Sequence, residues 1–142
     1  MTFSIVLATS GYELASSSSE DVFGPLHVLI AGQPFPATDW TDFAAPILGW
    51  WLEGVRTHFA EGRLETEVAF MDGPYALRIR TGPGGLELAG VRNGAVVAST
   101  QLSPAALTAE VEAAARRFLS AVALQGVDSK EVRVVRALLA GS

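Results

Sequence analysis

The sequence predicts an α+β fold: about six strands in one mainly antiparallel sheet, with two longer helices and a short C-terminal helix packed on one face. Three observations lead to it. Two short apolar segments open the chain, alternating apolar residues recur through 64–101, and apolar residues at helical spacing occupy 45–60 and the region after 103. The length of 142 residues fits one domain, spanning 1–142.

The first two strands are expected at residues 3–9 and 25–32. The second is apolar at nearly every position, which favours a central place in the sheet over an edge. Between them, the serine-rich stretch 15–21 is too polar to pack and is expected to be a loop.

A helix is expected at about 45–60, after a loose first turn that Thr38 or Asp39 can cap. Pro46 then lies in the first turn of the regular helix, whereas a regular start near Asp39 would put a kink at Pro46. At 100° per residue, the apolar side chains of this region cover an arc of about 200°, broader than a simple surface helix needs. We therefore expect the helix to press against the sheet and to touch a second helix on its flank.

Four strands in a meander are expected between 64 and 101. Pairing Phe70 with Tyr75 sets Val68 against Leu77 and Thr66 against Ile79 on one face, and Glu67 against Arg78 and Glu65 against Arg80 on the other. One register of this hairpin therefore places apolar residues opposite each other on one face and opposite charges on the other. The stretch 82–85 and the Asn-Gly pair at 93–94 predict the remaining turns. The charged face, which also carries Glu87, is expected to meet solvent or a second copy.

Two helices are expected to close the chain. Ser103 caps the first, Pro104 takes its first position and Gly126 ends it. Asp128 with Glu131 forms a variant capping box for a short terminal helix. That helix runs through Val132, Val135 and Leu139.

Composition and charge narrow the class of protein. The chain has no cysteine, its first residues do not resemble a secretory signal, and no segment has the roughly 20 apolar residues of a membrane span. We therefore expect a cytoplasmic protein. Residues 1–72 hold ten acidic and two basic side chains, and residues 73–142 hold five acidic and eight basic. This balance argues against nonspecific nucleic-acid binding and is compatible with a basic protein partner.

No motif for catalysis, metal or cofactor binding stands out. His27 and His58 have no partner at a metal-binding spacing, so a packed or capping role is expected unless the fold brings them together. The candidate carboxylates are Asp39, Asp42, Glu53, Glu65, Glu67 and Asp72, and none adjoins a recognisable nucleophile. The alternative that remains is a small enzyme with a pocket between sheet and helices that uses His58 and a carboxylate.

The tryptophans supply the other candidate site. One helix cannot present Trp40, Trp50 and Trp51 to a single point, so at least one of them is expected at the margin of the core. Core packing accounts for large side chains on a broad apolar arc. An exposed aromatic anchor ringed by acids would instead resemble a protein-binding hot spot. The candidate partner-binding residues are Asp39, Trp40, Asp42, Trp51 and Glu53.

The segments "FPATDWTDFAAPILGWWLEGV" and "VAFMDGPYALRI" resemble small bacterial α+β proteins of the immunity type, which are encoded beside polymorphic toxins. The resemblance covers about residues 26–80. Its residues are Trp40, Asp42, Phe43, Trp50, Trp51, Asp72, Gly73, Pro74 and Tyr75. It implies a cytoplasmic inhibitor that binds and occludes a toxin, and it supplies no catalytic residue.

These observations favour a non-enzymatic protein-binding module, most concretely an immunity-type inhibitor of a basic toxin. The small enzyme described above is one alternative. The other alternative is a homodimeric structural protein whose two copies meet through a sheet face or edge.

Overall fold

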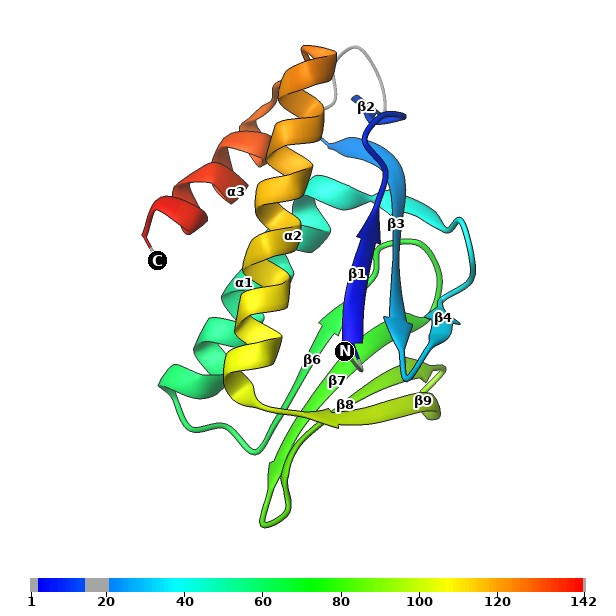
Figure 1. Ribbon diagram of the computed structural model, residues 1–142, viewed down its shortest axis with the longest axis vertical. Helices are drawn as coiled ribbons and strands as arrows, with labels where there is room; N and C mark the ends of the chain where they lie inside the picture. The colour runs from blue at the N-terminus through cyan, green and yellow to red at the C-terminus, as the bar shows by residue number, and fades with distance from the viewer. Residues whose placement is uncertain (1–2, 15–20, 142) are drawn as a thin grey trace.

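The computed structural model describes residues 3–14 and 21–141 and has the predicted α+β class (Figure 1). The expected single sheet is wrong, because the described strands form two antiparallel sheets, one of five strands and one of four. The stretch 15–21, predicted to be a loop, lies outside the described residues except for Asp21.

The first sheet is organised around β3 (Val22–Ile30), which pairs with every other strand of that sheet. Its partners are β1 (Phe3–Leu7), β2 (Glu13–Leu14), β4 (Gln33–Phe35) and β5 (Thr41–Phe43). Residue Val28 pairs with both β1 and β4, and Phe23 with both β2 and β5, so β3 has neighbours on both edges. The predicted central position of this apolar strand is confirmed.

The second sheet is the predicted meander, in the order β6-β7-β8-β9. The strands are β6 (Glu65–Ala69), β7 (Tyr75–Gly82), β8 (Gly85–Arg92) and β9 (Ala95–Leu102). The register inferred for the first hairpin is confirmed at each of its four strand pairs. Asn93 and Gly94 both have positive φ, 50° and 80°, as the tight β8–β9 turn requires.

The charged side chains of the meander lie on its solvent face, as expected. Arg78 Nε lies 3.1 Å from Glu65 and 3.0 Å from Glu67, and Arg80 lies 3.6 Å from Glu65. The opposite face supplies buried apolar side chains to the core: Val68, Leu77, Ile79, Leu86 and Leu88.

The first helix, α1 (Ala44–Ala60), begins where the sequence indicated and has Pro46 in its first turn. The predicted cap at Thr38 or Asp39 is wrong. Residues 41–43 pair with β3 as β5, so the helix follows a strand directly, and Phe43 at its N-terminus makes no side-chain capping bond.

The other helices are α2 (Pro104–Gln125) and α3 (Lys130–Ala140). Ser103 Oγ accepts a hydrogen bond from the Ala106 amide at 3.0 Å, and Gly126 ends α2 in the left-handed conformation, as predicted. The capping box at Asp128 is displaced by one residue. Ser129 is the cap of α3 and accepts from the Val132 amide, whereas Asp128 accepts from the Ser129 amide.

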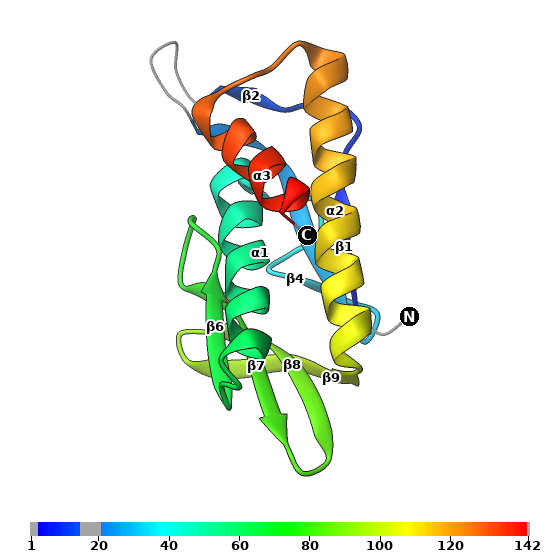
Figure 2. The ribbon, with the colours of Figure 1, turned by 90° about the vertical axis from the view of Figure 1, so that its left-hand side faces the viewer.

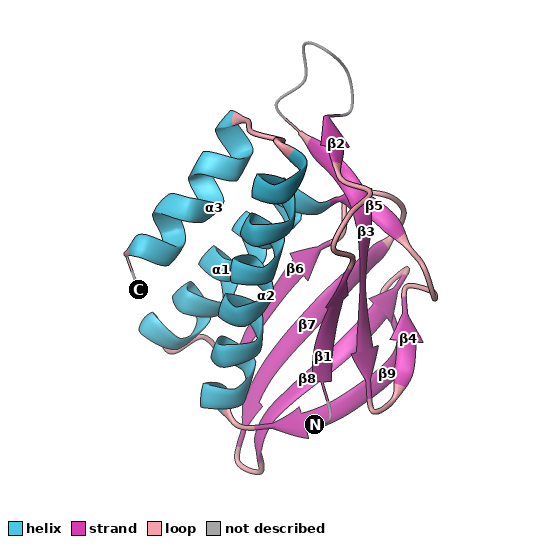
Figure 3. Cartoon of the chain, turned by 45° about the horizontal axis from the view of Figure 1, so that its top comes forward, coloured by secondary structure: helices cyan, strands magenta, loops and turns pink. Residues whose placement is uncertain are grey.

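The helices lie on one side of the molecule and the strands on the other, in agreement with the prediction (Figure 3). α1 contacts β3, β6 and both other helices, and α2 packs against β1. The largest fully buried side chains, which include Trp51, Phe118 and Leu26, come from helices and strands alike. No helix among the described residues combines the length and apolar character needed to cross a membrane.

Candidate functional site

The three tryptophans lie in different environments. Trp51 is 1% exposed and packs edge-on against Phe70, with 5.2 Å between the ring centroids. Its Nε1 donates a hydrogen bond to the Ala69 carbonyl at 3.2 Å. Trp40 is partly buried, whereas Trp50 is 45% exposed. The structure thus divides the aromatic stretch between interior and surface, with Trp50 at the surface.

Asp42 is fully buried and accepts three hydrogen bonds. Its Oδ1 accepts from the Phe43 amide at 2.7 Å, and its Oδ2 accepts from Trp40 Nε1 at 3.0 Å and from the Asp72 amide at 3.1 Å. A buried carboxylate needs such partners, since burying an unpaired charge is costly. Asp42 therefore joins β5 to the turn between β6 and β7.

A row of aromatic rings runs beside this joint. Trp40 meets Tyr75 at 5.2 Å, and Tyr75 meets Phe35 at 5.7 Å. Phe35 meets Phe70 at 5.8 Å, and Phe70 meets Trp51. All of these contacts are edge-on, the geometry that aromatic pairs favour. The two segments that carry the immunity-type resemblance therefore pack against each other.

Two of the five predicted partner-binding residues thus belong to the interior. Asp42 and Trp51 are enclosed by the contacts just described, so a partner cannot reach them in the folded protein. Asp39 and Glu53 are exposed, and Trp40 is partly buried. The sequence pattern could not show that Asp42 lies in a strand and that its carboxylate points into the protein.

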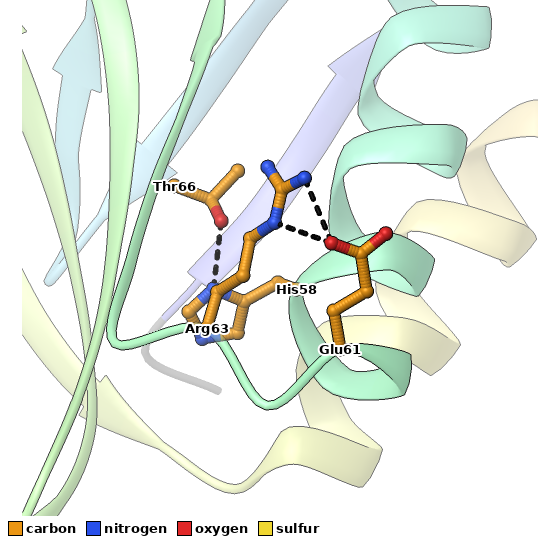
Figure 4. Close-up of polar contacts among 4 residues, drawn as sticks. All are labelled: His58, Glu61, Arg63 and Thr66. Atoms are coloured by element: carbon orange, nitrogen blue, oxygen red, sulfur yellow. Dashed lines mark hydrogen bonds and ion pairs between the residues drawn. The ribbon is translucent and has the colours of Figure 1, made fainter.

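His58 does not have the surroundings that the enzyme alternative requires. It is buried, and its Nδ1 lies 2.8 Å from Thr66 Oγ1, as Figure 4 shows, while Nε2 lies 2.7 Å from Thr81 Oγ1. Burial, aided by the nearby Arg63 charge, lowers the pKa of His58 below its ordinary value of 6.5. In the part of the chain that is described, its ring nitrogens contact hydroxyl groups and no carboxylate. The carboxylate that the enzyme alternative places beside His58 is therefore not among its hydrogen-bond partners in the described residues.

His27 is also largely buried, and burial lowers its pKa as well. The packed role expected for both histidines is confirmed. Across residues 3–14 and 21–141, no three His, Cys, Asp or Glu side chains gather as a metal site would require.

A groove of about 420 Å³ lies between α1 and β6, the two elements side by side in Figure 2. Its lining residues are Trp50, Glu53, Gly54 and Thr57 from α1, Arg63 from the connecting loop, and Thr66, Glu67, Val68 and Ala69 from β6. Within α1, Gly54 allows the close approach, because a Cβ at this position would lie 2.4 Å from Val68 Cγ1.

One carboxylate in this groove has no partner within the described part of the chain. Arg63 is paired with Glu61, at 3.1 Å through Nε and 2.9 Å through Nη2 (Figure 4). Glu67 is paired with Arg78. Glu53 is exposed and makes no ion pair or hydrogen bond with any residue that the structure describes. The unbalanced charge of the groove is therefore negative and lies beside Trp50.

Trp50 was the functional candidate that the sequence analysis missed. The signal was present in the helical wheel. Trp50 lies at the end of the apolar arc, about 60° from Glu53. A tryptophan at that boundary can contact the core with one edge and solvent with the other.

No protein-family model, curated protein or solved structure matches the chain. The immunity-type resemblance stays a prediction.

Proposed function

We propose that this chain is a non-enzymatic protein-binding module whose partner contacts the groove between α1 and β6. One observation carries the proposal: Trp50, a large aromatic side chain, is 45% exposed in a groove beside the unpaired carboxylate of Glu53. Tryptophan is among the residues most enriched in binding hot spots, and a neighbouring charge selects for the complementary partner.

The charge distribution favours a basic partner. The first 72 residues carry ten acidic and two basic side chains, and the groove is built from Trp50–Ala69 within that half. Opposite charge accelerates the encounter of two proteins and disfavours partners of the wrong sign. A cytoplasmic inhibitor that occludes a basic toxin is the specific form of this function that the resemblance implies.

The residues behind the resemblance support this proposal unequally. Asp42, Trp51 and Tyr75 hold the fold together, so their presence in a pattern indicates shared structure more than shared binding. Trp50 is the member of the pattern with a large exposed aromatic surface. Its role in binding can therefore be separated experimentally from the role of the pattern in folding.

Affinity capture from the native cell tests the proposal. The wild type should recover one dominant protein, and Trp50→Ala and Glu53→Lys should each lose it. Leu124→Ala and Glu13→Lys are the matched controls, because both residues are exposed and lie outside the groove. Recovery of the same protein by both groove variants, or the absence of any specific protein with the wild type, would contradict the proposal.

A further inference from the structure

The strand that forms one wall of the groove is the edge of the second sheet. β6 pairs with β7 on one side and ends the strand order on the other. In an antiparallel pair, alternate residues turn their amide and carbonyl groups toward the partner and away from it. An edge strand therefore presents a row of backbone groups to whatever lies beside it.

Three hydrogen bonds show which residues of β6 face outward. The Phe70 amide donates to Tyr75 and the Leu64 carbonyl accepts from Thr81, so the even-numbered residues turn toward β7. The Ala69 carbonyl accepts from Trp51 Nε1 and thus turns away from β7. By this alternation, the backbone groups of Glu65 and Glu67 also face the open edge.

Glu67 is the central residue of that edge and one of the residues that line the groove. Its side chain is paired with Arg78 on the solvent face of the sheet. Its outward amide and carbonyl make no hydrogen bond with another described residue of the chain. The groove therefore offers one backbone donor and one backbone acceptor, with Trp50 and Glu53 on the facing helix.

The first sheet shows how this fold protects an edge from pairing. At the outer edge of β1, the Ile5 amide donates to Glu110 Oε2 at 2.8 Å, and the Ile5 carbonyl accepts from Arg117 Nη2 at 2.9 Å. Side chains of α2 thus occupy both backbone groups that an added strand would use. The corresponding groups of Glu67 have no such cover.

The free backbone groups of Glu67 indicate the conformation of the occupant. The residues within an α-helix bond their amide and carbonyl groups to one another, so a helix in the groove would leave the groups of Glu67 unpaired. An extended chain beside β6, at the usual strand spacing of about 4.8 Å, satisfies them.

We infer that the groove binds an extended segment of a partner protein by adding it as a strand to β6, and that this segment carries a lysine or arginine side chain. The inference rests on the function proposed above and specifies its binding mode. The cationic group lies between the Trp50 ring, which attracts it through a cation–π contact, and the Glu53 carboxylate. Backbone pairing supplies affinity, and these two side chains supply selectivity.

A library of random twelve-residue peptides, displayed on phage and selected against the full chain, tests the inference. The selected peptides should share a lysine or arginine within a β-prone stretch. Their affinity, measured by fluorescence anisotropy with synthetic peptides, should fall with added salt and by about tenfold or more in Glu53→Lys or Trp50→Ala.

A proline at position 67 tests the strand addition itself. Glu67→Pro removes an outward amide, which proline at a sheet edge can do without breaking the ladder to β7. Affinity should fall by about tenfold relative to Glu67→Ala, the size expected for one backbone hydrogen bond. Ser99→Pro is the control: Ser99 also turns its amide outward, but at the β9 edge, and this variant should bind as the wild type does.

Far-UV circular dichroism shows whether Glu67→Pro has folded. If it has not, selected peptides carrying one N-methyl group at successive positions give the same information, because alternate positions should lose binding. Equal binding by Glu67→Pro and Glu67→Ala, or by every N-methylated peptide, would overturn strand addition.

The remaining outcomes separate this inference from the proposed function. If a native protein is captured through Trp50 and Glu53 but no peptide is selected, the partner presents a folded surface; the function then holds and the inference fails. If neither is found, both fail. A dimer in solution that Glu67→Pro converts to a monomer would make a second copy the occupant and would overturn the inference.

Discussion

Replacing Asp42 tests whether a buried carboxylate joins the two sheets. Asp42→Ala removes an acceptor that three donors share, from Trp40, Phe43 and Asp72. A hydrogen bond to a charged group contributes about 1.5 to 3 kcal/mol, and the three bonds that Asp42 accepts are part-buried. The bond from the Phe43 amide joins neighbouring residues of the chain, so the bonds from Trp40 and Asp72 dominate the loss. We expect Asp42→Ala to lower the free energy of unfolding by about 3 to 5 kcal/mol.

Asp42→Asn makes the test more specific. An amide has one acceptor oxygen, so it can keep the two bonds of Oδ2 only by turning its NH₂ group toward the Phe43 amide. The expected loss is about 2 kcal/mol, smaller than for alanine. Asp72→Asn is the matched control. It removes an exposed charge from the same turn but keeps the backbone donor, and it should change stability by less than about 0.5 kcal/mol.

Urea unfolding followed by both circular dichroism and tryptophan fluorescence gives these values, provided that the two probes report one transition. A loss below about 1 kcal/mol for Asp42→Ala would refute the reasoning, since the donors would then have found other partners at little cost.

Three further predictions follow from local geometry. Gly54→Ala should destabilise the protein by about 1 to 3 kcal/mol, because the added Cβ would lie 2.4 Å from Val68 Cγ1. Gly49→Ala should stabilise it by up to about 1 kcal/mol, because the nearest atom to its added Cβ is 4.0 Å away. Chemical denaturation compares the free energies of unfolding of the two variants. Because the folded-state pKa of His58 lies below 6.5, its contribution to stability is present above pH 6.5 and is lost as the pH falls below it. His58→Gln should flatten the fall in unfolding free energy between pH 7 and 5, and an unchanged slope would contradict the pKa shift. Trp50→Phe should remove most of the emission that acrylamide quenches, because Trp50 is 45% exposed; undiminished quenching would place the exposed indole elsewhere.

Local rules were sufficient for the long elements of the fold. The first hairpin of the meander was placed in the correct register because Val68 opposite Leu77 and Glu67 opposite Arg78 can be satisfied by one pairing alone. The limits of α2 followed from Ser103 and Gly126, each of which acts on the nearest turn of the helix.

Local sequence rules failed where an element forms only by pairing with a strand far away in the sequence. Strand β5 has three residues and too little pattern to be recognised, and it forms because β3 lies beside it. Because residues 41–43 form this strand, α1 begins at Ala44 and neither Thr38 nor Asp39 caps it. The division into two sheets has the same origin, since the short strands attach to β3 and not to the meander.

The sequence by itself determined the α+β class, the meander, the spans of the long helices and the acidic character of the first half, because periodicity, turn residues and charge act over a few neighbouring positions. The helical wheel places Trp50 at the margin of the apolar arc and Trp51 within it, but only the tertiary structure decided that Trp50 is 45% exposed and Trp51 is buried. Tertiary structure likewise decided that Asp42 and His58 are enclosed, because hydrogen-bond partners from residues 66, 72 and 81 reach them only when separate segments pack together. The candidate site therefore depended on packing between elements, which local patterns do not encode.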